Sequence, residues 1–205
     1  MKRKGPSFGH VEVEYRLGIV FKRAVKEFQR AHADTEKAEK EYEAKGKPAE
    51  LLPQCFSNRE RKMEAGVVLI MAAGAWLEQI INDYAHTFLD ADWYEEHLDN
   101  LRTVTKWILL PHLCQKKEIS EDDPAINGLR EFIKARNAVV HHKRRDLYLN
   151  PHKASKQTST ESSRFWLACK NAESTVDGLI EILTSPPPGA KKPETASGNP
   201  HKNCC

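Results

Sequence analysis

Apolar residues recur every three to four positions in five segments of the chain, and this spacing places them on one face of an α-helix. The first segment covers Val13–Tyr42 and ends where Gly46 and Pro48 break the pattern. Alternating apolar residues over 11–15 leave a short strand open as the alternative for its beginning.

The second segment is the most apolar part of the chain. Ser57 and Glu60 have the spacing of a capping box, which predicts that a helix begins at Ser57. Small residues between Gly66 and Ala75 leave room for a neighbouring helix, so we expect this helix at the centre of the fold. Its apolar stripe repeats at steps of four and three: Met63, Val67, Ile70, Gly74, Leu77, Ile81, Tyr84 and Phe88.

Capping residues and prolines predict the limits of two further helices. Asp92 begins a third helix that Pro111 ends, because proline lacks the amide hydrogen and clashes with the preceding turn. Asp123 before Pro124 opens a fourth helix that runs to about Val140.

The fifth helix is predicted to begin with another capping box, Thr158 with Glu161, and to end before Pro186. We expect residues 185–205 to be disordered, because they contain almost nothing apolar. Residues 1–11 form an N-terminal tail in this scheme, and residues 12–184 form an all-α bundle of about five helices. Four tryptophans are expected in its core: Trp76, Trp93, Trp107 and Trp166.

Composition limits the classes of protein to which the chain can belong. Its 205 residues suit one domain, and the longest stretch without a charge, residues 65–77, is too short to cross a bilayer. The N-terminus carries no recognisable secretory signal, so we expect a cytoplasmic protein without a membrane partner. The five cysteines contain no Cys-x-x-Cys pair and are predicted to be reduced thiols.

The fourth helix contains a charge where its pattern calls for a core residue. Arg136 falls on the apolar stripe, and Asn137 lies on the adjacent flank. An arginine is costly to bury without a partner, and such local inconsistency tends to mark a functional position. His141 follows Asn137 by four residues, so both share one face if the helix continues, and His142 comes next.

These residues resemble the signature of the HEPN superfamily (higher eukaryotes and prokaryotes nucleotide-binding domain), in which an arginine is followed after four to six residues by a histidine. Arg136 to His141 reads R-N-x-x-x-H, and His142 also fits the spacing. The stretch from Arg136 to Lys143 is similar to the RN-x-x-V-H-x-K variant. A motif late in an all-α chain, before one last helix, agrees with the bundle of that family.

The resemblance implies a metal-independent endoribonuclease, often a toxin or defence effector, whose homodimer brings two motifs into one cleft. It implies no cofactor, and a cognate antitoxin or a neighbouring defence protein as a further partner. From the chemistry alone, His141 or His142 can take a proton from a ribose 2′-hydroxyl near neutral pH. Arg136 can hold the scissile phosphate, and Asn137 can orient the histidine or the phosphate.

The charge around this motif is locally basic, although the whole chain has a net charge of only +3. Eight basic residues stand against two acidic ones between Arg130 and Lys156, which suits an RNA backbone. The candidate RNA contacts are Lys134, Lys143, Arg144 and Arg145.

Other interpretations of the same residues remain open. Arg136 could pair with a buried acid at a polar helix end. Glu78 and Asp83 are candidates for this acid, although ordinary surface charge is the simpler interpretation of both residues. Metal binding by His141, His142 and His152 lacks a suitably spaced acidic or cysteine ligand. At the level of function, the alternatives are a non-catalytic RNA- or nucleotide-binding module and an antitoxin or effector subunit.

Overall fold

The structure is a computed structural model that describes residues 16–140 and 151–186, with the backbone alone described at 151–162. All the regular elements in these ranges are helices, which confirms the all-α prediction. The predicted N-terminal tail, residues 12–15 and residues 187–205 lie outside the described residues. The elements are α1 (Arg16–Ala44), the 3₁₀ helix η1 (Ala49–Leu51), α2 (Leu52–Phe88), α3 (Ala91–His97), α4 (Thr103–Gln115), α5 (Pro124–Val140) and α6 (Pro151–Thr184).

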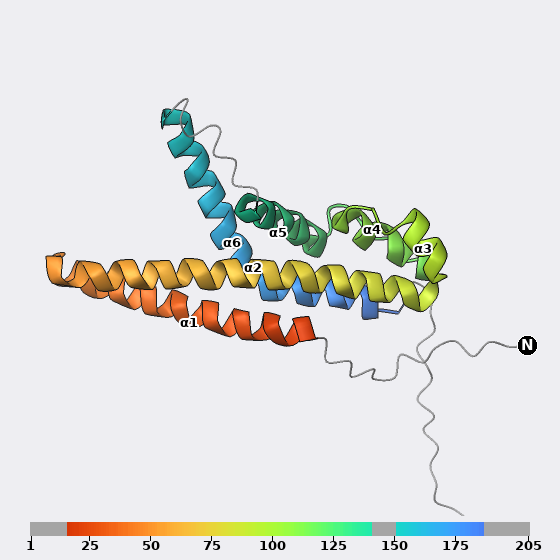
Figure 1. Cartoon of the computed structure of the whole chain (residues 1–205), viewed down its shortest axis with the longest axis horizontal. Coiled ribbons are helices and arrows are strands. Elements are labelled where there is room, and N and C mark those ends of the chain that lie inside the picture. Colours follow the sequence, from red (N-terminus) through yellow and green to blue (C-terminus); the bar gives the residue numbers. More distant parts are fainter. Residues whose placement is uncertain (1–15, 141–150, 187–205) are drawn as a thin grey trace, which may run out of the picture.

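α2 is the central helix, as its apolar sequence predicted. Figure 1 shows α1 beside it, α3, α4 and α5 along another side, and the C-terminal half of α6 packed against it. Leu69, Ile70, Leu77 and Ile81 are at most 1% exposed, so the middle of α2 has neighbours on several sides. The N-terminal part of α6 points away from the other helices (Figure 1).

α1 and α2 form an antiparallel hairpin. Gly46 has a φ of 75° and Lys47 a φ of 62°, and the amide of Lys47 donates to the carbonyl of Tyr42 at 2.8 Å. This left-handed turn ends α1 within the region that the sequence indicated. Between the helices, Phe21 packs on Trp76 with their ring centroids 5.1 Å apart.

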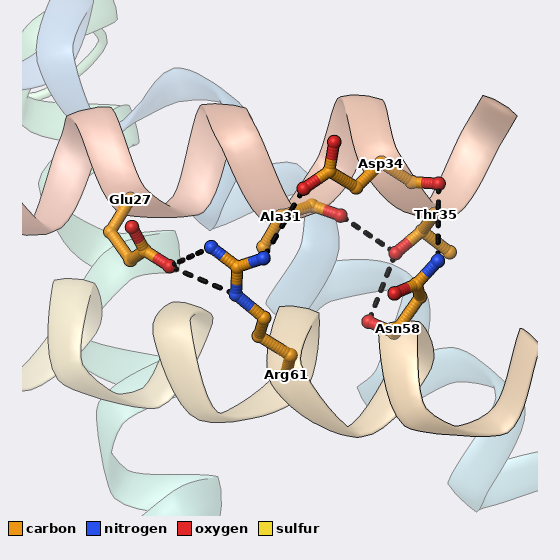
Figure 2. Close-up of polar contacts among 6 residues, drawn as sticks. All are labelled: Glu27, Ala31, Asp34, Thr35, Asn58 and Arg61. Carbon is orange, nitrogen blue, oxygen red and sulfur yellow. Dashed lines mark hydrogen bonds and ion pairs between the residues drawn. The ribbon is translucent and has the colours of Figure 1, made fainter. Parts of the chain in front are cut away.

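A polar cluster joins the same two helices farther along the hairpin (Figure 2). Arg61 of α2 lies 2.5 Å from Oε1 of Glu27 and 3.2 Å from Oδ2 of Asp34, both on α1. The buried hydroxyl of Thr35 lies 2.7 Å from the carbonyl of Ala31 and 3.0 Å from that of Asn58. Polar and apolar contacts therefore alternate along the hairpin, which favours one register of the two helices.

The predicted start of α2 at Ser57 is wrong. The helix begins at Leu52 after η1, and Ser57 is an exposed residue inside it. Pro53 explains the difference, because proline suits the first turn of a helix, where its missing amide hydrogen is not needed. The buried Cys55, whose thiol lies 3.7 Å from the carbonyl of Ala38, holds this first part of α2 against α1.

The predicted third helix is two helices. α3 begins after Asp90, not Asp92, and the carboxylate of Asp90 accepts the amide of Trp93 at 3.1 Å. Pro111 does not end α4 but lies inside it and is buried. The lost hydrogen bond is tolerated because Trp107 and Leu110, both 0% exposed, anchor this helix in the core.

α5 begins as predicted, since the carboxylate of Asp123 accepts the amide of Ala125 at 2.8 Å. α6 begins at Pro151, so Thr158 and Glu161 lie inside it and do not form its start. As at the start of α2, a proline in the first turn marks the boundary that the capping pattern misplaced. The helix ends at Thr184, shortly before Pro186, as expected.

Aromatic rings fix α6 to the hairpin where it crosses α2. Trp166 stacks near Phe28 with centroids 6.3 Å apart, and the ammonium of Lys62 lies 4.6 Å from the Trp166 ring. The core prediction is correct for Trp76 and Trp107, and Trp166 is half-buried. It is wrong for Trp93, which is 44% exposed because the short α3 turns it outward.

Candidate functional site

Arg136 lies where α5 packs on α2. Gly74 of α2 has no side chain there, and a β-carbon placed on it would be 3.1 Å from Cδ of Arg136 and 3.7 Å from its Nε. One turn earlier on α5, Phe132 is 1% exposed. The half-buried arginine therefore occupies the seam position that the sequence assigned to it, and a small residue of α2 makes room for it.

The guanidinium group of Arg136 has neither an ion pair nor a hydrogen bond with any residue that the structure describes. Neither Glu78 nor Asp83, the two acidic candidates on α2, pairs with it. The carboxylate of Glu78 binds the buried Lys106 instead, so Glu78 is not an ordinary surface charge. Asp83 is half-buried, and its backbone carbonyl accepts from Thr87. A partly buried cation without an acidic partner is well suited to bind an anionic ligand.

The rest of the predicted motif is described only as far as α5 extends. Asn137 is exposed, next to Arg136, and α5 is described to Val140. His141 and His142 lie outside the described residues, as do Lys143, Arg144 and Arg145. Their approach to Arg136 therefore stays a prediction.

Two basic groups of the predicted RNA-binding region already have acidic partners. Nζ of Lys134 lies 2.6 Å from Oε1 of Glu131, and Nη2 of Arg130 lies 3.1 Å from Oε2 of Glu121. Exposed pairs of this kind contribute at most about 1 kcal/mol. Lys134 can thus exchange its carboxylate for a phosphate at low cost, and its contact with RNA stays a prediction.

Sequence patterns missed a buried lysine between α2 and α4. Lys106 is 1% exposed, and its Nζ lies 3.1 Å from Oε1 of Glu78 and 3.0 Å from Oδ1 of Asn82. A third acceptor, Oδ1 of Asp99, is 3.3 Å away. All three ammonium hydrogens therefore have acceptors.

Two further residues complete this network. The hydroxyl of Tyr94 donates to Asn82 at 2.8 Å, and the hydroxyl of Thr103 donates to Glu78. Burial by itself lowers the pKa of Lys106, but hydrogen bonds with Glu78 and Tyr94 outweigh it, so the pKa is raised. The lysine remains a charged, fully bonded group that joins α2, α3 and α4, and it is not a nucleophile, which would need a neutral amine.

A signal for this network was present in the sequence. Glu78 and Lys106 are isolated charges in the apolar parts of two different helices, and an ion pair between them lowers the cost of burying the lysine. Periodicity within one helix does not reveal which helix supplies the partner.

A histidine beside the aromatic row is the second candidate for chemistry. His32 stacks on Phe28 with centroids 5.9 Å apart and borders a cavity of about 130 Å³ between α1 and α6. Its Nε2 lies 3.3 Å from Oε1 of Glu36, and its Nδ1 is buried without a hydrogen-bond partner. Burial, followed by the charge of Lys62, lowers the pKa of His32, so the ring is neutral at pH 7.

Neither a metal centre nor a reactive thiol emerges from the described residues. In residues 16–140 and 163–186, no group of three or more His, Cys, Asp or Glu side chains is placed to hold a metal ion. Cys55, Cys114 and Cys169 are free thiols. Burial raises the pKa of Cys114 to about 11 and that of Cys169 to about 12, which keeps both protonated and unreactive.

Among the described helices, one segment is long and apolar enough to cross a membrane by length and composition. It covers Ala49–Phe88, and 56% of its most apolar window is buried inside the protein. The central helix of a helical bundle has the same properties, and this burial is what the position of α2 produces.

Comparison with known proteins gave no match to a family model, a curated protein or a solved structure. The class of protein that the fold defines is an all-α helical bundle, with a partly buried arginine on α5 as its candidate site.

Proposed function

We propose that the protein is a metal-independent endoribonuclease in which Arg136 binds the scissile phosphate and His141 is the general base. The observation that carries the proposal is the position of Arg136. It is half-buried against Gly74 on a core helix and has no acidic partner among the described residues. A structural arginine at such a place would be paired, whereas an arginine that receives phosphate must be free to do so.

The proposed chemistry uses the residues of the R-N-x-x-x-H motif. His141 removes the proton of a ribose 2′-hydroxyl, and the oxygen attacks the adjacent phosphorus atom. The bond to the 5′-oxygen breaks, this oxygen takes up a proton, and a 2′,3′-cyclic phosphate remains. Arg136 stabilises the charge that develops on the phosphate, and Asn137 orients the reacting groups. His142, next to His141 in the sequence, is the candidate for the group that gives the 5′-oxygen its proton.

Apolar side chains near Arg136 support the proposed homodimer. Val140, one turn beyond Arg136 on α5, is 49% exposed, and Met71, one turn before Gly74 on α2, is 39% exposed. Val68, on the preceding turn of α2, is 53% exposed. A two-fold contact through this surface would bury the same side chains on both copies and bring two Arg136 residues toward one cleft.

The test compares RNA cleavage and RNA binding by purified variants of the full chain. Arg136→Gln keeps the contact of the side chain with Gly74 but removes its charge, and we expect cleavage to fall by roughly 10² or more, with weaker binding. Arg59→Gln is the matched control, because Arg59 is an exposed arginine of α2 outside the basic stretch around the motif, and its partner is Glu39 at 2.7 Å. It should leave cleavage nearly unchanged.

Variants of the two histidines identify the base. His141→Ala should lower the cleavage rate by roughly 10² to 10⁴ and leave RNA affinity nearly unchanged. His142→Ala should have a smaller effect, and the reverse order would assign the base to His142. RNA binding without cleavage above the level of His141→Ala would replace the nuclease by a non-catalytic binding module.

A further inference from the structure

A groove between α5 and α6 has acidic groups and no basic ones among its lining residues. It has a volume of about 670 Å³ and follows the N-terminal half of α5, away from the end that carries Arg136. Its floor is made of small or apolar residues: Ala125, Gly128, Phe132, Thr175, Gly178 and Ile182. We call it the α5–α6 groove.

Small residues bring the two helices close together beneath this groove. A β-carbon placed on Gly128 would be 2.5 Å from Oγ1 of Thr175, and one placed on Gly178 would be 3.1 Å from Cβ of Ala125. The backbones of α5 and α6 therefore come close to each other at Gly128 and Gly178. The groove suits a peptide whose own residues are small and which approaches the backbone closely.

The acidic groups of the groove differ in their partners. Glu131, at one end, lies 2.6 Å from Lys134 and 3.9 Å from Arg164. Asp123 and Glu181, at the other end, have no ion pair with any described residue, although Asp123 accepts the amide of Ala125. This end keeps uncompensated negative charge, which repels RNA and attracts a basic segment.

The chain itself supplies a basic segment at this end. Ser185 lines the groove, and the sequence continues from it through Gly189 and Ala190 to Lys191 and Lys192. Six residues span up to about 20 Å, whereas Asp123 and Glu131 mark a stretch of α5 about 12 Å long. Both lysines can therefore reach the acidic end of the groove.

We propose that residues 187–205 of the same chain dock in the α5–α6 groove, with Lys191 and Lys192 paired with Asp123 and Glu181. Gly189 and Ala190 then lie over Ala125 and Gly178. A tethered segment acts at millimolar effective concentration, so weak ion pairs are sufficient. Because these pairs are exposed, the docked form should be lost as the ionic strength rises.

Carbodiimide cross-linking of the full chain tests the proposal, because this reagent joins a lysine to a carboxylate only when they are in contact. Mass spectrometry should find Lys191 or Lys192 joined to Asp123 or Glu181. Asp177 is the internal control, since it is exposed on α6 but does not line the groove. We expect cross-links to Asp123 or Glu181 to be at least about tenfold more frequent than cross-links to Asp177.

A second experiment exchanges the charges of residues 181 and 191. Glu181→Lys should abolish the cross-link at residue 181. Adding Lys191→Glu should restore a cross-link between residues 181 and 191. A mixture of isotopically light and heavy protein separates cross-links within one chain from cross-links between copies. Three results would each overturn the proposal: cross-links spread evenly over surface carboxylates, cross-links only between copies, or no cross-link of residues 191 and 192.

Discussion

Single residues decide how closely the helices of this protein pack. Gly66 and Gly74 both lie on α2 under another helix, but their neighbours differ. A β-carbon on Gly66 would be 2.9 Å from Cζ of the buried Phe165 ring, whereas one on Gly74 would meet the aliphatic part of Arg136 at 3.1 Å. A flexible arginine can move aside, and a ring packed in the core cannot.

This difference predicts opposite outcomes for two alanine substitutions. Gly66→Ala should lower the free energy of unfolding by about 1–3 kcal/mol because it overpacks the core. Gly74→Ala should change it by less than about 1 kcal/mol, because the gain in helix propensity offsets the shift of Arg136. Urea denaturation measures both. A larger loss for Gly74→Ala than for Gly66→Ala would contradict the described packing.

The environment of His32 predicts a pH dependence of stability. Burial lowers the pKa of His32 in the folded protein, so the unfolded chain binds the proton first as the pH falls. Stability should therefore decrease below about pH 6.5, the usual pKa of histidine, down to the lowered pKa. His32→Gln should lose less stability between pH 7.5 and pH 5 than the wild-type protein does. An equal loss in both proteins would show that His32 is not responsible.

At the level of elements, periodicity identified the helices better than capping patterns located their ends. The apolar stripes gave the all-α class and the central place of α2, because burial of one face is a property of the whole segment. Ser57 and Thr158 were misplaced as helix starts because proline in the first turn, Pro53 in α2 and Pro151 in α6, marks an earlier start; in α2 the buried Cys55 also holds the first turns against α1. A local pattern cannot weigh such contacts.

Two variants test these helix starts. Asp90→Ala removes a side chain that accepts the amide of Trp93 and should lower stability by about 1 kcal/mol. Ser57→Ala should have almost no effect, because Ser57 is exposed in the interior of α2. Thermal unfolding of the two proteins distinguishes a real cap from a chance match. A comparable loss for Ser57→Ala would support the capping box after all.

The contacts between elements were the part that sequence patterns could not provide. The stripe predicted the seam position of Arg136, and Gly74 confirmed that α2 makes room for it. The pairing of Lys106 with Glu78 joins residues on different helices, and nothing within either helix specifies the partner. The same reason left Met63, on the predicted apolar stripe of the second helix, 44% exposed, because none of the described helices covers it.

The Lys106 network predicts a strong coupling between α2 and α4. Lys106→Met should lower the free energy of unfolding by about 3 kcal/mol, because it leaves the carboxylates of Glu78 and Asp99 without their cation. These carboxylates are partly exposed, which keeps the loss at the low end of the usual range. Adding Glu78→Gln should recover part of the stability. A further, additive loss in the double variant would argue against a direct pair.

On the scale of the whole molecule, the helical bundle holds a partly buried cation at one end of α5 and an acidic groove at the other. This separation agrees with the proposed phosphate-binding role of Arg136, since the negative charge of the groove repels RNA. The proposed dimer acts at the same end, through exposed apolar residues of α2 and α5. A mixture of inactive Arg136→Gln and inactive His141→Ala chains therefore probes whether two motifs share one cleft.

The most direct test of the nuclease is the chemistry of the RNA ends that the purified protein produces in EDTA. We expect cleavage that leaves 2′,3′-cyclic phosphate ends, and a strong loss of these ends with Arg136→Gln and with His141→Ala. Cleavage that stops in EDTA, cleavage that leaves 3′-hydroxyl ends, or equal cleavage by the His141→Ala protein would contradict it.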